Sequence, residues 1–202
     1  MSRENVYEKF EVEYLTVKIV NDEGPSNPRD DHSGSLFFGW HKRYLCGDDP
    51  AKHGMPSAHH LREVFPDGWD EIRAHIEETF KPRCILPVFM YDHGGVAYST
   101  GSFGCSWDSG QIGFIFTHGP DDDWADPEAA LKALVEEYSD WASGNVWGYV
   151  VENSEGDVES SCWGFIGNPD ESGVIEEGRS SAEWLIEREK REAQRCADAV
   201  RL

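Results

Sequence analysis

The sequence predicts an α+β fold, in which an antiparallel or mixed sheet packs against helices. The first observation is a set of short runs of β-branched and aromatic residues between glycine-containing turns, which is typical of strands. The second is a set of segments whose apolar residues recur at helical spacing. The third is their order along the chain: a strand, helices, three strands, a helix, two strands and a last helix. Because strands and helices do not alternate regularly, this order favours α+β over a parallel α/β fold.

The expected strands follow from alternation and from the turns between them. The chain is most apolar between Ile85 and His118, where Asp92–Gly95 is a glycine-containing hairpin turn and Gly101–Gly110 a longer loop. A second hairpin turns at 153–157. At the N-terminal end we expect one long strand with a bulge near Leu15, where the alternation changes phase. The predicted strands are Tyr7–Val20, Ile85–Tyr91, Val96–Thr100, Ile112–Thr117, Val146–Glu152 and Val158–Ile166.

Capping residues place the expected helices. A short helix is expected at Ala58–Phe65, and Asp67 is the predicted N-cap of a longer one that ends before Pro82. Asp126-Pro127 starts the next, which stops near Gly144. The spacing from Ser180 to Glu183 is that of a capping box, and it predicts a C-terminal helix to about Val200. Because the apolar stripe of this helix (about 181–200) is thin, we expect it to be peripheral. No boundary is evident, so a single domain over 1–202 is predicted.

The charge balance limits the partners that the protein can have. Of its 202 residues, 39 are acidic and 18 are Lys or Arg, which gives a formal net charge of −21. Such a charge repels nucleic acid and anionic membranes. We therefore expect no direct nucleic-acid binding and no membrane binding, and a partner with a basic surface. Two simpler explanations, solubility and adaptation to a salty cytoplasm, stay open.

The cysteines and the lack of apolar segments indicate a cytoplasmic protein. The five cysteines are widely spaced and contain no CxxC pair, which is neither a disulfide framework nor a zinc motif. The sequence contains no apolar run long enough to cross a bilayer. We expect reduced thiols, no metal and no cofactor.

Four polar residues near the ends of the central strands are candidates for chemistry. Asp92, His93, Asp108 and His118 could together bind a metal or exchange protons. Asp92 and His93 are adjacent, however, so their side chains would point apart on a strand, and both residue types are common in turns. Cys105 could act as a nucleophile with a histidine, or it could be a buried thiol.

The aromatic residues Trp40, Trp107, Trp147, Trp163 and Phe165 are expected in the core. A buried indole N–H needs a hydrogen-bond acceptor, for which Asp108 or Gln111 would serve. This gives the 101–110 loop a structural explanation that competes with catalysis. We predict that Trp107 and Asp108 are structural.

Clusters of carboxylates give the second candidate site. They include Asp121, Asp122 and Asp123, which precede the helix after Asp126, and Glu136, Glu137 and Asp140 on that helix. Carboxylates spread over one face could imitate the phosphates of DNA and occupy the basic groove of a nucleic-acid enzyme. A solvated helix face is the simpler explanation of any one cluster.

Five segments resemble a family of small proteins carried by bacteriophages and other mobile elements. They are Asn27–Arg29 (NPR), Gly39–Asp48 (GWHKRYLCGD), Tyr91–Gly95 (YDHGG), Cys105–Phe114 (CSWDSGQIGF) and Ser161–Phe165 (SCWGF). The resemblance covers about residues 27–167. It implies a phage origin and an accessory role outside the virion, such as counter-defence, and it transfers no catalytic residues.

Taken together, these observations lead to two hypotheses of function. The first is a phage-encoded protein in the host cytoplasm that inhibits a defence protein, such as a nuclease, through an acidic, DNA-like surface. The second is a small hydrolase or nucleotide-processing enzyme that uses the region of Asp92, His93, Cys105 and Asp108. The position of the acidic residues relative to that loop distinguishes between the two.

Overall fold

A computed structural model of the 202-residue chain describes residues 5–30, 32, 34–118 and 124–199. The chain divides into two compact units. The terminal unit comprises Met1–Ser26 and Gly144–Leu202, and the central unit comprises Asn27–Ser143. Each unit has an antiparallel sheet packed against helices, so the predicted α+β class is confirmed. The single domain expected over 1–202 stays a prediction.

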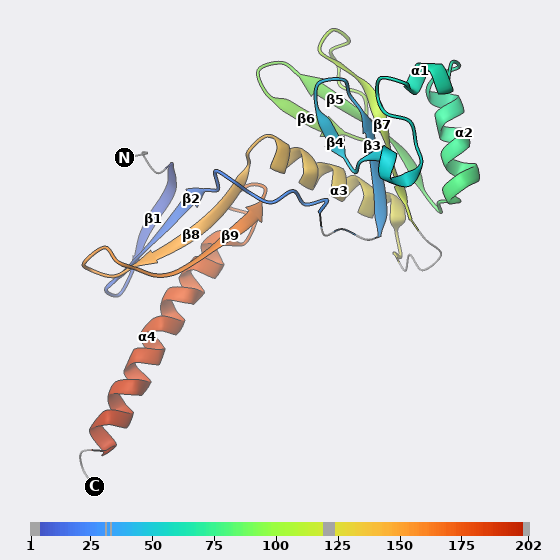
Figure 1. The fold of residues 1–202 in the computed structure, drawn as a ribbon. Coiled ribbons are helices and arrows are strands. Elements are labelled where there is room, and N and C mark those ends of the chain that lie inside the picture. The colour runs from blue at the N-terminus through green and yellow to red at the C-terminus, as the bar shows by residue number, and fades with distance from the viewer. Residues whose placement is uncertain (1–4, 31, 33, 119–123, 200–202) are drawn as a thin grey trace. The chain divides into compact units, whose positions relative to one another are not determined.

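The terminal unit is a four-stranded sheet with one long helix against it (Figure 1). Its strand order is β1-β2-β8-β9, and every neighbouring pair is antiparallel. The strands span Val6–Val12 (β1), Leu15–Asn21 (β2), Val146–Glu152 (β8) and Val158–Ile166 (β9), and the helix spans Val174–Ala199 (α4).

The N-terminal segment is a hairpin and not the single bulged strand that we expected. Val12 pairs with Leu15, so Glu13 and Tyr14 alone form the turn. Glu13 has a φ of 53°, the left-handed conformation that short hairpin turns need. The change of phase in the alternation of apolar residues near Leu15 therefore marks the turn. The turn was not recognised in the sequence because neither of its two residues is glycine.

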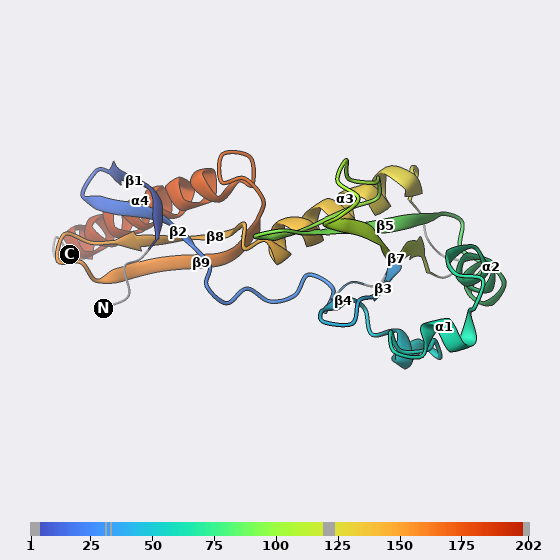
Figure 2. The same ribbon diagram turned by 90° about the horizontal axis from the view of Figure 1, so that it is seen from above.

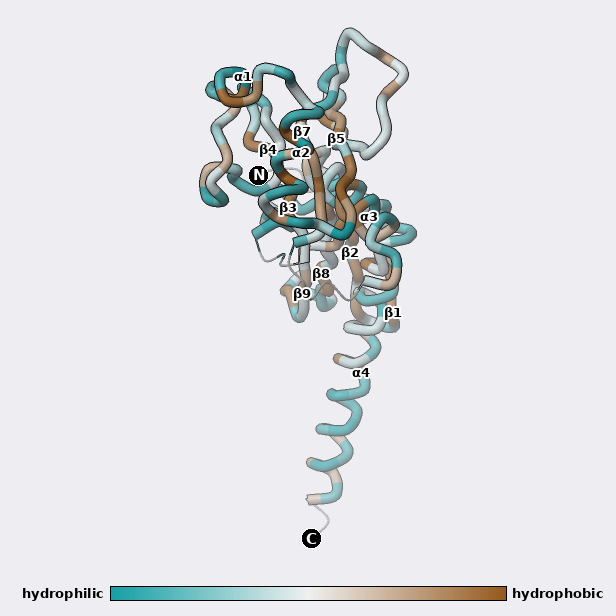
Figure 3. The backbone as a smooth tube through the Cα atoms, turned by 90° about the vertical axis from the view of Figure 1, so that its right-hand side faces the viewer, coloured by the Kyte–Doolittle hydropathy of each residue, from teal (hydrophilic) through white to brown (hydrophobic). Residues whose placement is uncertain are grey.

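Helix α4 begins at Val174, well before the predicted capping box, which lies inside the helix. The buried residues of its first half, including Ala182, Leu185 and Ile186, pack on β2 and β8. Gly178 permits this close approach, because a Cβ at this position would lie 2.9 Å from Cγ1 of Val17. From Glu189 to Ala199 every residue is exposed, and this part of the helix is mostly hydrophilic (Figure 3). The expectation of a peripheral helix over about 181–200 stays a prediction.

The central unit is a five-stranded antiparallel sheet of order β4-β3-β7-β5-β6. Its strands span Ser35–Trp40 (β3), Leu45–Gly47 (β4), Ile85–Asp92 (β5), Val96–Ser99 (β6) and Ser109–Thr117 (β7). Its helices span Pro50–His53 (η1), Leu61–Val64 (α1), Trp69–Phe80 (α2) and Pro127–Ala142 (α3). One face of the sheet packs against α1 and α2 and the other against α3 (Figure 2).

Covering on both faces explains why β3 is buried throughout. All six residues of this strand are buried, and successive side chains enter opposite layers. Phe38 packs with α2, whereas Phe37 packs with α3. The strands approach closely at Gly113, where a Cβ would lie 1.8 Å from the carbonyl oxygen of Phe38. β3 and β7 thus form the centre of two cores at once.

The helix ends match the expected signals in part. Asp126 caps α3, because its side chain accepts a hydrogen bond from the amide of Ala129 (3.0 Å). Helix α2 begins after Gly68, whereas the backbone amide of Asp67 donates to Glu71, so the Asp67 cap was wrong by one residue. The helix expected at Ala58–Phe65 is a single turn, Leu61–Val64.

A buried ion pair joins the start of the central unit to β3 and β4. The guanidinium of Arg29, whose side chain is 4% exposed, lies 2.7 Å from a carboxylate oxygen of Asp48. It also donates to the hydroxyl (3.2 Å) and carbonyl (2.8 Å) oxygens of Ser35, and Asp48 accepts from the amide of Phe37 (2.7 Å). The amide of neighbouring Gly47 donates to the hydroxyl of Tyr138 on α3 (3.0 Å). The charged pair therefore joins the loop to both strands, and the adjacent Gly47 links them to the helix.

We predict that Arg29→Met lowers the free energy of unfolding by about 3–5 kcal/mol, because it leaves the Asp48 carboxylate in a largely dry site without its cation. Chemical denaturation measures this. The matched control is Arg73→Met, which breaks the exposed Arg73–Glu77 pair on α2 and should cost no more than about 0.5 kcal/mol. Equal effects of the two substitutions would show that the buried pair has no special role.

Candidate functional site

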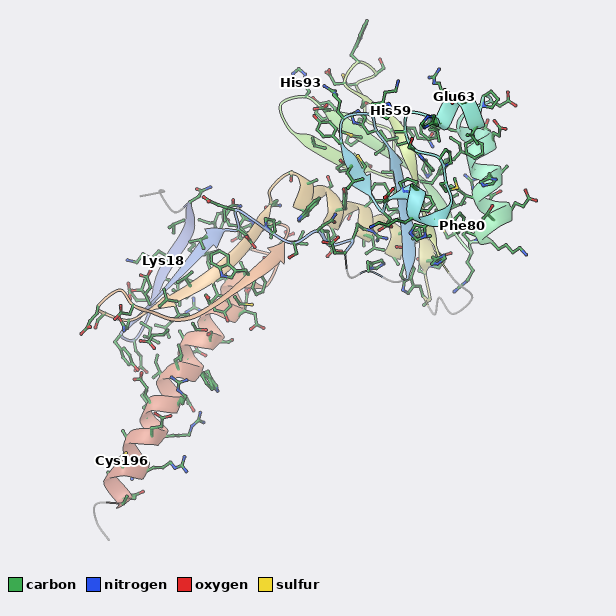
Figure 4. The ribbon with its side chains drawn as sticks, viewed as in Figure 1. Lys18, His59, Glu63, Phe80, His93 and Cys196 are labelled. Carbon is green, nitrogen blue, oxygen red and sulfur yellow. The ribbon has the colours of Figure 1, made fainter. Side chains whose placement is uncertain are left out.

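Three segments meet at one end of the central sheet and form a polar cluster. They are the turn between β3 and β4 (41–44), the turn between β5 and β6 (93–95) and the loop that precedes β7 (100–108). The amide of Asp92 donates to the carbonyl oxygen of Asp108 (2.9 Å), which holds the second segment to the third. Figure 4 shows His93 on the β5–β6 turn, at the edge of this cluster.

Asp92 faces the β3–β4 turn. Its carboxylate accepts hydrogen bonds from the Arg43 guanidinium (3.0 Å) and the Tyr44 hydroxyl (3.2 Å). The Tyr44 ring stacks on His41, with 4.8 Å between ring centroids. Partial burial, reinforced by the positive charge of Arg43, lowers the pKa of His41 and favours the neutral imidazole. Asp92 therefore acts as a clamp between two turns.

His93 faces the opposite way from Asp92, as expected for adjacent residues, and meets Asp108. Its Nδ1 lies 3.4 Å from a carboxylate oxygen of Asp108, and the thiol of Cys105 lies 3.6 Å from the same oxygen. The hydroxyl of Ser109 donates to the carbonyl oxygen of Cys105 and closes the loop. The carboxylate thus stands between the thiol and the imidazole.

This order limits what the cluster can do chemically. An activated cysteine has a base beside its sulfur that accepts the thiol proton, commonly an imidazole. Here the neighbour of the Cys105 sulfur is a carboxylate, and the His93 side chain is 70% exposed. The same contacts suit a loop that is held in one conformation by its own side chains. The geometry favours the structural explanation of Asp108 over catalysis.

His118 does not belong to this cluster. It follows the far end of β7, whereas Ser109 starts that strand beside the cluster. Its ring lies near Phe80 and His53, with centroids 6.2 and 6.5 Å away. The expected convergence of four residues was wrong for His118, because a nine-residue strand separates its two ends by about 30 Å. Among the described residues, no three His, Cys, Asp or Glu side chains are placed to hold a metal ion.

The expectation that Trp107 lies in the core was wrong. Its side chain is 95% exposed, at the outer part of the 101–108 loop. Trp163 is also largely exposed, whereas Trp40 is buried and donates its indole N–H to the carbonyl oxygen of Pro56 (2.8 Å). Trp147 donates to the side chain of Asn145 (2.8 Å). The indoles that need acceptors therefore find them away from Asp108 and Gln111.

The acidic candidates lie on α3, apart from the polar cluster. Glu136 and Glu137 are exposed, and Asp140 is half-buried, one turn further along the same helix. Glu128 is exposed too and pairs with Lys132 (2.6 Å), the one basic residue of this helix. Leu131, Val135 and Tyr138 point into the core, so the acidic side chains occupy the outer face. Asp121, Asp122 and Asp123 lie outside the described residues.

Sequence reasoning missed the partners that organise these sites. Arg29, Asp48, Arg43 and Tyr44 stood out only as parts of the segments that resemble phage proteins. A charged residue beside Pro28 in a polar loop is usually solvated, so nothing local indicated that Arg29 is buried. The burial of Arg29 becomes evident only from its ion pair with Asp48, which is 19 residues away in the sequence.

Comparison of the chain with protein-family models, curated proteins and solved structures finds no match. The resemblance to phage proteins therefore stays a prediction. In the described part of the chain no helix is both long and apolar enough to cross a bilayer. None of the five cysteines, all within the described residues, forms a disulfide.

We expect Asp108→Asn to loosen the loop, because the neutral amide accepts a weaker hydrogen bond from the Cys105 thiol and has no charge to attract a protonated His93. The free energy of unfolding should fall by about 1 kcal/mol. Alkylation of Cys105, followed by peptide mass spectrometry, should become faster, while alkylation of exposed Cys162 stays unchanged. An unaltered melting temperature together with loss of function would instead place Asp108 in a working site.

Proposed function

We propose that this chain is an accessory protein that binds a basic-surfaced partner protein through the outer face of α3. The observation that carries the proposal is the row of carboxylates on that face. Glu136 and Asp140 are four residues apart, with Glu137 next to Glu136, whereas Glu128 lies two turns earlier, beyond Lys132. Residues four apart lie on one side of a helix, so Glu136 and Asp140 form a short stripe, with Glu137 beside it and Glu128 at its N-terminal margin.

The stripe is anchored firmly enough to act as a binding surface. The inner face of α3 contributes Leu131, Val135 and Tyr138 to the core, and all three are almost fully buried. A rigid helix presents its charges without a large loss of conformational entropy on binding. Of the carboxylates on the stripe, Glu128 has a neighbouring cation, Lys132.

The spacing of the carboxylates on α3 can be compared with the spacing of phosphates in DNA. One strand of DNA carries a phosphate about every 3.4 Å along the axis, whereas side chains four residues apart on a helix are separated by about 6 Å. The stripe on α3 is thus less dense than a DNA strand. A DNA-like surface would need further carboxylates, and Asp121–Asp123 precede α3 in the chain.

Helix α2 provides an internal comparison. Its exposed residues include Asp70 and Glu78, but it packs against the opposite face of the sheet from α3. The two acidic helices cannot form one continuous surface. Local binding at α3 is therefore the form of the hypothesis that the geometry supports best.

The resemblance to phage proteins suggests the kind of partner. For a phage-encoded protein in the host cytoplasm, a defence nuclease or another nucleic-acid-binding enzyme is the target that we propose. Such enzymes carry basic grooves, and an acidic stripe would reach them by electrostatic steering.

A second candidate is an enzyme that uses the polar cluster, as a hydrolase or on a nucleotide. The observation that favours it is the contact of Asp108 with both His93 and Cys105. The arrangement of Asp92 weakens it, because this carboxylate is engaged by Arg43 and Tyr44.

The test is reversal of charge on α3. Glu136→Lys together with Glu137→Lys should slow association with the partner, captured first with the unmodified protein from infected host lysate. We expect at least a tenfold loss of affinity, and binding that weakens as salt rises, because exposed charges are screened over about 8 Å at physiological ionic strength. Surface plasmon resonance at several salt concentrations measures both.

The matched control is Asp70→Lys with Glu78→Lys on α2, which changes the net charge equally. It should leave binding nearly unchanged. Binding that ignores salt, or that responds equally to both pairs, would exclude the α3 surface. The corresponding reversal of Asp121, Asp122 and Asp123 tests whether the acidic surface extends beyond the helix.

A further inference from the structure

The two sheets have four edge strands, and three of them have features that discourage pairing with another chain. Exposed edges invite further strands, and proteins prevent this by keeping edges short or charged. In the central unit β4 has three residues and β6 has four. In the terminal unit β1 carries Glu8, Lys9 and Glu11 along its length.

β9, the other edge of the terminal sheet, lacks these features. It has nine residues, and the stretch from Ser160 to Ile166 contains no charge in a protein of net charge −21. Most of its side chains are exposed, among them Val158, Cys162 and Trp163. Its single strand neighbour among the described residues is β8, so the outer N–H and C=O groups of β9 have no strand partner there.

The indole of Trp163 lies against the sheet and does not project over the edge. A Cβ at Gly148, on the neighbouring strand, would come within 2.4 Å of Cε3 of this ring. Gly148 thus provides the space in which the indole rests. The outer backbone of β9 remains accessible beside it, and Gly164, with a φ of 87°, ends the regular stretch.

We propose that β9 pairs antiparallel with β9 of a second copy of this chain, around a two-fold axis at Ser161. In this register Ser160 faces Cys162 of the other copy and Glu159 faces Trp163. The two Glu159 carboxylates thereby avoid each other, whereas a register centred at Glu159 would place them opposite each other. The two four-stranded sheets would join into one.

A second copy fits this edge better than a foreign strand does. An antiparallel pair of identical strands is self-complementary, as a two-fold interface requires. Two molecules of this protein repel each other wherever acidic side chains face acidic side chains, and the 160–166 stretch is a surface without that penalty. The charge pattern therefore directs self-association to this edge and away from β1.

The proposal is independent of the acidic stripe on α3, and salt separates the two. Salt screens the repulsion between two acidic molecules, so pairing through β9 should strengthen as ionic strength rises. Binding of a basic partner through α3 should weaken under the same conditions.

The experiment is sedimentation velocity on the full-length chain, whose monomer mass is 22.8 kDa. At a concentration on the order of 100 µM, where a pair with a Kd near 1 µM is almost fully formed, we expect twice that mass. Ser161→Lys places two ammonium groups opposite each other and should weaken pairing at least about tenfold. Ser154→Lys, in the exposed β8–β9 turn, makes the same change of charge and should leave pairing intact.

A cross-link tests the register without relying on a disruptive change. In a chain in which Cys162 and Cys196 are replaced by Ser, Ser161→Cys should form a disulfide between copies on mild oxidation, and Ser154→Cys should not. A monomer at every salt concentration would overturn the proposal. So would equal loss of pairing in Ser161→Lys and Ser154→Lys, or equal cross-linking at the two positions.

Discussion

The ion pair between Arg29 and Asp48 is the constraint on which the central unit depends. Burying two charges is unfavourable unless they are paired and hydrogen-bonded, and here Arg29 donates to Asp48 and Ser35 while Asp48 also accepts from the amide of Phe37. Satisfying them requires Ser35, Phe37 and Asp48 to occupy fixed positions, which sets the pairing of β3 with β4. Gly47 then reaches Tyr138 and places α3. A loop residue thereby supports strands that contact the acidic helix.

Once β3 and β7 are covered on both faces, the places left for function are few. In the central unit, apolar side chains occupy both layers between sheet and helices, so the surfaces left for ligands and partners include the outer helix faces and the loops at the sheet ends. The α3 stripe is one such surface, and the cluster of Asp92, His93, Cys105 and Asp108 is another. In the cluster, Asp92 and Asp108 contact side chains of neighbouring turns and loops, and such contacts stabilise a loop conformation. On α3, Glu136 and Glu137 are exposed on the face turned away from the core.

The distribution of charge distinguishes the surfaces further. Acidic residues outnumber basic ones in both units, so acidity alone does not identify a binding site. Acidic residues on a rigid element do indicate a binding site, because a fixed array of charges can match the charges of a partner. Scattered charges mainly keep the protein soluble. The uncharged stretch of β9 indicates a contact surface for the opposite reason. In so acidic a chain, a second copy can approach closely at a stretch without charge.

The sequence by itself determined the class of the fold, most of the strands and the start of α3 at Asp126-Pro127, because periodicity, turn glycines and caps are local. It also indicated that Asp92 and His93 point apart. It did not reveal the hairpin turn at Glu13-Tyr14, the burial of Arg29, the exposure of Trp107 or the separation of His118 from Asp108. Each of these depends on contacts between residues far apart in the chain. Whether a tryptophan is covered or an arginine finds its carboxylate is settled only when distant segments pack together.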